Sequence, residues 1–152
     1  MTAKQFGLFF VGVFALLVGL SLVSAVTIFS DDFNDGNLNG WTVTNSPTTL
    51  PGTAWNNSGT FAEAKPGNST TTGTTTLERT ISTSGFTAIV VKYDRQLVGF
   101  DTEEEFKASW SVDNVNFTTL EESLNTTPDD TSFVTKTFNL PTSANNDADF
   151  KL

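Results

Sequence analysis

The stretch that decides the fold is FKASWSVD, residues 106–113, in which apolar and polar side chains alternate one by one. Successive side chains of an extended chain point to opposite faces, so this alternation indicates a β-strand with one buried face. The same pattern recurs in IVVKYDRQL, residues 89–97, whose apolar face holds Ile89, Val91, Tyr93 and Leu97. Both stretches therefore predict half-buried strands and not helices.

Further short strand candidates follow along the chain, with polar turns between them. They are residues 26–33, 41–45, 75–82, 117–120, 134–140 and 148–152. Two other regions, residues 46–60 and 65–73, are rich in Pro, Gly, Asn, Ser and Thr, and we expect them to form surface loops. Regularly spaced short strands with turns between them predict an all-β, antiparallel sandwich.

Several segments resemble secreted jelly-roll domains. FSDDFNDG at residues 29–36, followed by Gly40-Trp41, is similar to their first strand and turn. FKASWSVD is similar to a strand of theirs that ends in a Ser-x-Asp-Gly hairpin, with Asn114 in place of the glycine. The final stretch, residues 138–152, resembles their penultimate strands. The likeness covers most of residues 29–152.

The families that carry this pattern are the MAM-like and choice-of-anchor jelly rolls of bacterial and archaeal surface proteins, with carbohydrate-binding modules as more distant relatives. The resemblance implies an antiparallel jelly-roll β-sandwich of the concanavalin or galactose-binding type over residues 26–152. Because these families continue beyond the position of Leu152, we expect a domain truncated at its C-terminal end. The alternative is a domain completed by a strand that a neighbouring copy donates.

The first 25 residues predict a signal peptide. An uncharged apolar run from Phe6 to Val23 follows Lys4 and ends in Val23-Ser24-Ala25, which has the small residues that signal peptidase requires. We therefore expect residues 1–25 to form an apolar signal helix, and the mature protein to be extracellular or at the cell surface. The alternative is an uncleaved anchor, because the run reaches the lower length limit of a membrane-spanning helix.

Composition excludes several classes of function. The chain has 8 Lys and Arg against 17 Asp and Glu and a net charge of −9, so it lacks the basic surface that binds nucleic acid. It contains neither Cys nor His, which removes disulfides, thiolate nucleophiles and the usual zinc ligands. Oxygen-ligated hard cations remain compatible with the composition.

Three carboxylates cluster around a glycine turn at Asp31, Asp32 and Asp35. In the jelly rolls that this stretch resembles, such carboxylates often hold a structural calcium ion. Calcium takes six to eight oxygens, so a distant strand would have to supply the rest, with Asp147 and Asp149 as candidates. The alternative is an ordinary polar turn whose carboxylates are solvated.

Trp55, Asn56 and Asn57 lie in the expected loop 46–60. There an exposed indole could stack on a sugar ring while the amides bond its hydroxyl groups. Arg95 could join this carbohydrate site or could instead pair with acids on adjacent strands. The alternative for Trp55 is a side chain that folds back and plugs the end of the sandwich. Trp41 and Trp110, in contrast, are in phase with strand positions and are expected in the core.

Four sequons for N-glycosylation are present, because the motif Asn-x-Ser/Thr recurs without proline at the middle position. Their acceptor residues are Asn56, Asn68, Asn116 and Asn125. In a chain this rich in Asn, Ser and Thr, several sequons arise by chance, and their modification depends on the host cell.

The sequence as a whole predicts a secreted, non-catalytic recognition module that binds an extracellular glycan. The alternative is a structural or adhesive spacer, or a subunit of a surface layer or filament, whose partner is a neighbouring surface protein. An enzyme is not expected. The acidic run from Asp101 to Glu105 lacks the motif and the alternating aromatic residues of jelly-roll glycosidases, and without His or Cys a serine has no ordinary base.

Cleavage after Ala25 would make Val26 the first residue of the secreted protein. Mass spectrometry or Edman sequencing of the protein recovered outside the cell should therefore read Val26-Thr27-Ile28 first. Recovery of intact Met1 in the membrane fraction would instead show an anchor.

Overall fold

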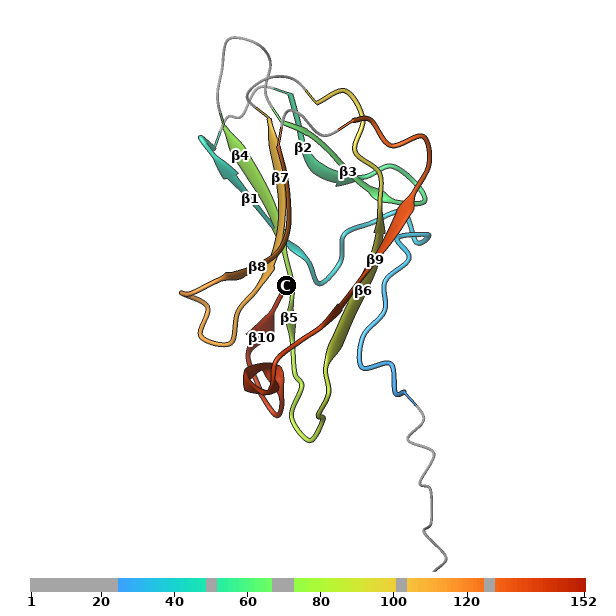
Figure 1. Ribbon diagram of the computed structural model, residues 1–152. Helices are drawn as coiled ribbons and strands as arrows, with labels where there is room; N and C mark the ends of the chain where they lie inside the picture. Colours follow the sequence, from blue (N-terminus) through green and yellow to red (C-terminus); the bar gives the residue numbers. More distant parts are fainter. Residues whose placement is uncertain (1–24, 49–51, 67–72, 101–103, 125–127) are drawn as a thin grey trace, which may run out of the picture.

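The computed structural model describes residues 25–48, 52–66, 73–100, 104–124 and 128–152, and this part of the chain is all-β (Figure 1). Its elements are β1 (Thr42–Ser46), β2 (Gly52–Asn57), β3 (Ala62–Pro66), β4 (Thr74–Glu78), β5 (Thr80–Ile81), β6 (Val90–Arg95), β7 (Glu105–Trp110), β8 (Thr118–Leu124), β9 (Val134–Asn139), the 3-10 turn η1 (Thr142–Ala144) and β10 (Phe150–Lys151). The expectation of an all-β chain is confirmed.

The described strands form antiparallel pairs, namely β1–β4, β2–β3, β5–β10, β6–β9 and β7–β8. In Figure 1, β1–β4 and β7–β8 lie on one side of the molecule and β6–β9 lies on the other. The pairs do not join into two continuous sheets, so the jelly-roll order of strands stays a prediction.

The alternation in the two deciding stretches is realised in β6 and β7. Val91 is buried and Tyr93 half-buried on β6, while Lys92 and Asp94 between and beside them are exposed. On β7 the burial increases along one face and ends at the buried Trp110. Each pair thus presents an apolar face to the interior and a polar face to water.

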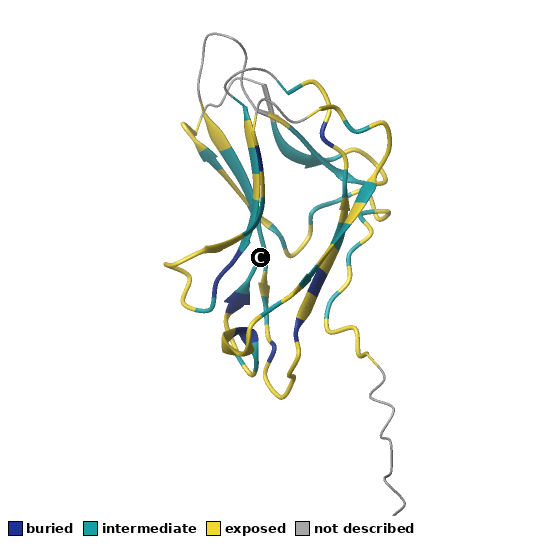
Figure 2. Cartoon of the chain, in the orientation of Figure 1, coloured by how far each residue is buried: buried dark blue, intermediate teal, exposed yellow. Residues whose placement is uncertain are grey.

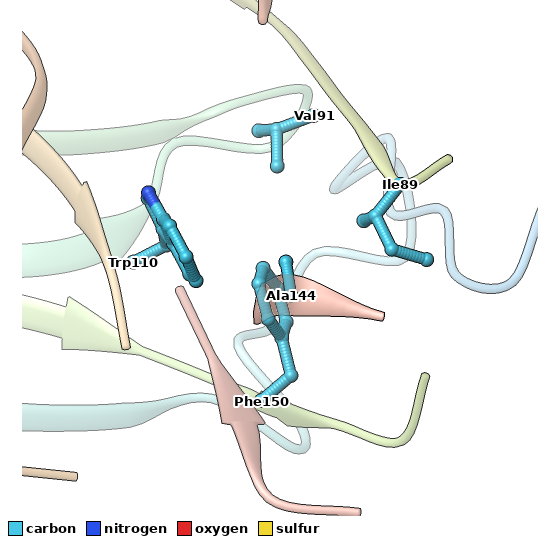
Figure 3. Close-up of a cluster of buried hydrophobic side chains, with 5 residues drawn as sticks. All are labelled: Ile89, Val91, Trp110, Ala144 and Phe150. Carbon is cyan, nitrogen blue, oxygen red and sulfur yellow. The ribbon is translucent and has the colours of Figure 1, made fainter. Parts of the chain in front are cut away.

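The core is a small cluster of side chains from both sides of the molecule (Figures 2 and 3). Its members are Ile89, Val91, Trp110, Ala144 and Phe150. The rings of Trp110 and Phe150 stack with their centroids 5.9 Å apart and their planes 22° apart. Because β6 contributes Val91 and β7 contributes Trp110, this cluster packs one side of the molecule against the other.

Strand β10 lies between two other segments and hydrogen-bonds to both. The backbone N–H of Lys151 donates to the carbonyl of Ser111 at 2.9 Å, and the N–H of Ser111 donates back at 3.0 Å. The next residue, Leu152, exchanges the corresponding pair of bonds with Arg79 at 3.0 and 2.9 Å. Consecutive residues that bond to opposite sides are the mark of an inner strand. This position explains how Phe150 is buried.

The strand expected at residues 26–33 does not form. Residues 25–28 are exposed and unpaired within the described part of the chain, and a series of turns begins near Asp31. Asp31 and Asp32 each accept a hydrogen bond from a backbone N–H two residues on, at 2.9 and 3.1 Å. Short polar side chains that bond their own backbone in this way compete with strand pairing.

The expected loops 46–60 and 65–73 are also partly wrong, because the first contains strand β2 and the second begins within strand β3. The turn between the strands is held by Asn57, whose Oδ1 accepts a hydrogen bond from Gly59 N–H at 2.6 Å. Gly59 has φ of +102°, a conformation that favours glycine. Because β2 and β3 are polar and lie next to turn-forming residues, the sequence pattern did not predict them as strands.

Of the expected signal helix, residues 1–25, only Ala25 lies within the described residues. No helix within the described ranges is long and apolar enough to cross a membrane.

Replacing Trp110 by Ala should lower the free energy of unfolding by about 3–5 kcal/mol, because the indole fills the centre of a small core. Urea denaturation followed by circular dichroism measures the change. The matched control is Phe117→Ala, which removes an exposed aromatic residue and should change the free energy of unfolding only slightly. Equal destabilisation by both variants would contradict the location of the core.

Candidate functional site

The acidic turn, defined here as residues 29–41, is built around Asp31. One carboxylate oxygen of Asp31 accepts the N–H of Phe33 at 2.9 Å, and the other accepts the indole Nε1–H of Trp41 at 2.8 Å. Trp41 is half-buried and packs against Phe29 and Phe33, with ring centroids 5.9 and 5.8 Å away. Both oxygens of Asp31 therefore hold the turn together. Trp41 belongs to this local cluster and is not part of the main core.

Asp32 and Asp35 also bond to the turn itself. Asp32 accepts the N–H of Asn34 at 3.1 Å, and Asp35 accepts the N–H of Asn37 at 3.2 Å. The hydrogen bond from the backbone of Asn34 holds the pKa of Asp32 below its usual value. These contacts match the alternative of a polar turn, in which each carboxylate caps its own backbone.

The side-chain amide of Asn57 connects the acidic turn to the β2–β3 hairpin. The Nδ2 group of Asn57 donates to the carbonyl of Phe33 at 2.8 Å and to the carbonyl of Asn37 at 3.0 Å. Its Oδ1 is used by Gly59. Asn57 therefore has both of its amide protons and its carbonyl oxygen engaged inside the protein, which leaves little capacity for a sugar hydroxyl.

Arg79, which directly follows β4, also binds the acidic turn, and no motif in the sequence predicts this role. Its guanidinium lies 4.2 Å from the centre of the Phe29 ring and donates to the carbonyl of Asn39 at 3.1 Å. Gly40 has φ of +81°, and a Cβ there would overlap the guanidinium. The glycine of the Gly-Trp pair thus makes room for a cation–π contact.

The carboxylates proposed for calcium do not assemble into a metal site. Within the described ranges, no group of three or more acidic side chains is placed to hold an ion. Asp149 is exposed beside η1 and β10, where its N–H donates to Asp147 at 2.8 Å. Asp31, Asp32 and Asp35 are committed to backbone contacts. Calcium binding stays a prediction from the resemblance.

Trp55 lies in strand β2 and not in a loop. Its indole Nε1–H donates to the carbonyl of Thr75 at 3.2 Å, and its backbone N–H donates to the hydroxyl of Thr75 at 3.3 Å. The side chain is half-buried. Asn56 beside it donates to the carbonyl of Ala54 at 3.3 Å. Trp55 therefore ties the hairpin to β4, which is closer to the alternative of a packed indole than to a free stacking surface.

Arg95 lies in a polar cluster between the two sides of the molecule, here called the interior ion cluster. Its members are Tyr93, Arg95, Glu121, Asp130 and Lys136. The Nε and one terminal nitrogen of Arg95 donate to Glu121 at 2.9 and 2.5 Å, and the other terminal nitrogen donates to Asp130. All three nitrogens are thus engaged, and the alternative of pairing with acids is the one that the contacts favour.

Glu121 is the centre of this cluster, and its side chain is only 9% exposed. It reaches from β8 to Arg95 and Tyr93 on β6 and to Lys136 on β9, at 2.9 Å from the Lys136 ammonium. Burial raises the pKa of Glu121, but hydrogen bonds from Arg95, Lys136 and Tyr93 outweigh it and hold the pKa below its usual value. Burial and this hydrogen bond raise the pKa of the Tyr93 phenol.

An open hollow of about 2850 Å³ lies between the two sides of the molecule, and exposed residues such as Val26 and Val98 form part of its lining. Trp41 and Trp55 line it together with many other residues. Small-molecule pockets usually measure about 300–1,000 Å³, so this space is the incompletely filled gap between the two sides. Its shape therefore does not define a ligand site.

The remaining candidate residues are spread over the fold. Asn116 is exposed at the β7–β8 turn, whereas Asn68 and Asn125 lie outside the described residues. In the acidic run, Glu105 pairs with Lys107 at 2.8 Å, and Asp101 and Glu103 also lie outside the described residues. No catalytic arrangement of these side chains follows from the contacts.

Comparison of the chain with models of protein families, with curated proteins and with solved structures finds no match. The function therefore has to be argued from the residues themselves, and the resemblance to jelly-roll surface domains stays a prediction.

Replacing Glu121 by Gln should lower the free energy of unfolding by about 3 kcal/mol, since it removes the anion from a nearly buried cluster and leaves Arg95 and Lys136 undercompensated. In the same variant, the free energy of unfolding should fall less steeply at acidic pH than in the wild type. With its pKa lowered by folding, Glu121 contributes stability in full above about pH 4.3, and that contribution disappears as the pH falls toward its folded value.

Urea melts between pH 3 and pH 7 check both effects, with Glu122→Gln as the matched control. Glu122 is the next residue on β8, is about half exposed and pairs with Lys107 on the outer face at 2.9 Å, so its replacement should have little effect at neutral pH. If Glu121→Gln kept the full stability and the full acid slope of the wild type, the interior ion cluster would have no part in stability.

Proposed function

We propose that this chain is a secreted or cell-surface, non-catalytic β domain that acts as a structural or adhesive subunit, with a neighbouring surface protein as its partner. One observation carries the proposal. The side chains best suited to hold a glycan, namely Trp55, Asn57 and Arg95, are committed to contacts that join separate segments of the fold. The hydrogen-bonding groups of these side chains thus hold the fold together.

The charge of the protein supports the same role. A net charge of −9 favours solubility outside the cell and disfavours polyanionic partners such as nucleic acid. Many of the positive side chains are already neutralised, as in the pairs of Lys107 with Glu105 and of Lys151 with Glu78, at 2.8 and 3.5 Å. No catalytic role is proposed, because the contacts of the described acidic side chains are structural.

Glycan recognition is the second candidate, and the position of Trp55 favours it. The indole is half-buried and borders the central hollow, so one part of its ring remains accessible. Aromatic rings bind sugars through their faces, which need no hydrogen bond from Nε1. This candidate requires the ring, whereas the structural role requires the Nε1–H bond to Thr75.

Two measurements separate the candidates. When its own cells are fractionated, the protein should stay with the envelope. An amine reagent that does not cross membranes should label the exposed Lys65 on intact cells. The purified protein should give no signal on a glycan array. Trp55→Phe should lower the free energy of unfolding by about 1 kcal/mol, because it removes one hydrogen bond to Thr75 and keeps an aromatic ring.

A glycan signal that Trp55→Phe largely keeps and Trp55→Ala abolishes would replace the structural proposal by carbohydrate recognition. Failure of the membrane-impermeant reagent to label intact cells would remove both candidates, since both place the protein outside the cell.

A further inference from the structure

The turn between β7 and β8 presents a sequon at its tip. Asn116, Phe117 and Thr118 are all exposed there, and Thr118 is the first residue of β8. The other described sequon begins at Asn56, which is half-buried within β2 and paired with Glu63 of β3. Of these two sequons, only that of Asn116 leaves the acceptor side chain open to a bulky group.

Asp113 fixes the shape of this tip. Its carboxylate accepts the backbone N–H groups of Val115 and Asn116 at 2.9 and 2.7 Å and the Nδ2 group of Asn116 at 2.6 Å. Hydrogen bonds from Asn116 and Val115 hold the pKa of Asp113 well below its usual value. Asn114 takes φ of 58°, the left-handed conformation that Asn tolerates. The Asn116 side chain is therefore presented in one orientation.

The two residues that flank Asn116 in the sequence are apolar and exposed. Val115 is 78% exposed and Phe117 is 42% exposed. A tight turn normally carries polar residues at its tip, and Val115 has the highest exposed fraction among the large apolar side chains of the described residues. This exposure is an observation independent of the sequon.

We propose that Asn116 carries an N-linked glycan whose first sugars cover the neighbouring Val115. The donor is an oligosaccharide linked through diphosphate to a membrane lipid. Nδ2 forms a bond to the anomeric carbon, the bond from that carbon to the diphosphate oxygen breaks, and one amide proton leaves to a base of the transferase. The lipid diphosphate is the leaving group. The remaining N–H on Nδ2 still donates to Asp113, so the folded turn accommodates the product.

The inference rests on the proposed export of the chain, because the transferase acts on exported segments. Peptide mass spectrometry of the protein recovered from its own cells should find glycan mass on the peptide that contains Asn116 and none on the peptide that contains Asn56. Thr118→Ser keeps the sequon and should keep the glycan. Thr118→Ala destroys the sequon without touching Asn116 and should lose the glycan completely.

An unmodified Asn116 in protein that is labelled outside intact cells would overturn the inference and leave the proposed function standing. Glycan mass that persists on Asn116 in Thr118→Ala would also overturn it, since the modification would then be of another kind. If the protein were found only inside the cell, the proposed function would be wrong as well.

Discussion

The contact of Glu121 with Arg95 is the constraint on which the two-sided arrangement depends. Glu121 projects from β8, and its partners Arg95 and Lys136 lie on β6 and β9 across the interior. Burial of charges costs free energy, and pairs such as these stabilise only when their hydrogen bonds are satisfied. The bond from the Tyr93 hydroxyl at 2.8 Å completes this requirement. Since the apolar cluster is small, these directional contacts specify how the two sides meet.

The acidic turn is held by directional contacts of the same kind, most of them to backbone groups. Asn57 and Arg79 bind the carbonyl groups of the acidic turn, while Asp31 binds the Trp41 indole from within. Asn57 and Arg79 thereby join segments that are distant in sequence, from residue 33 to residue 79. Asp31, Asn57 and Arg95, whose side chains are of types associated with ligand binding, thus serve the architecture here.

Strands with strong alternation could be predicted from the sequence, because burial on one face leaves a period of two in β6 and β7. Hairpin β2–β3 could not, since its partners are turn-forming and polar residues whose pairing depends on Thr75 and the acidic turn, which are distant in sequence. Residues 26–33 show the reverse error. Their composition suits a strand, but the side chain of Asp31 bonds the local backbone first. The partners of Arg95 likewise required the three-dimensional arrangement.

The inner position of β10 has a consequence for the order of events during synthesis. Phe150 completes the core, and Lys151 and Leu152 bridge Ser111 and Arg79, so β5, Arg79 and Ser111 lack these partners until residues 150–152 have left the ribosome. Contacts between distant parts of a chain form slowly, and until then the apolar faces of the earlier strands remain open to aggregation. The core of the described fold therefore closes late in synthesis, when Phe150 becomes available.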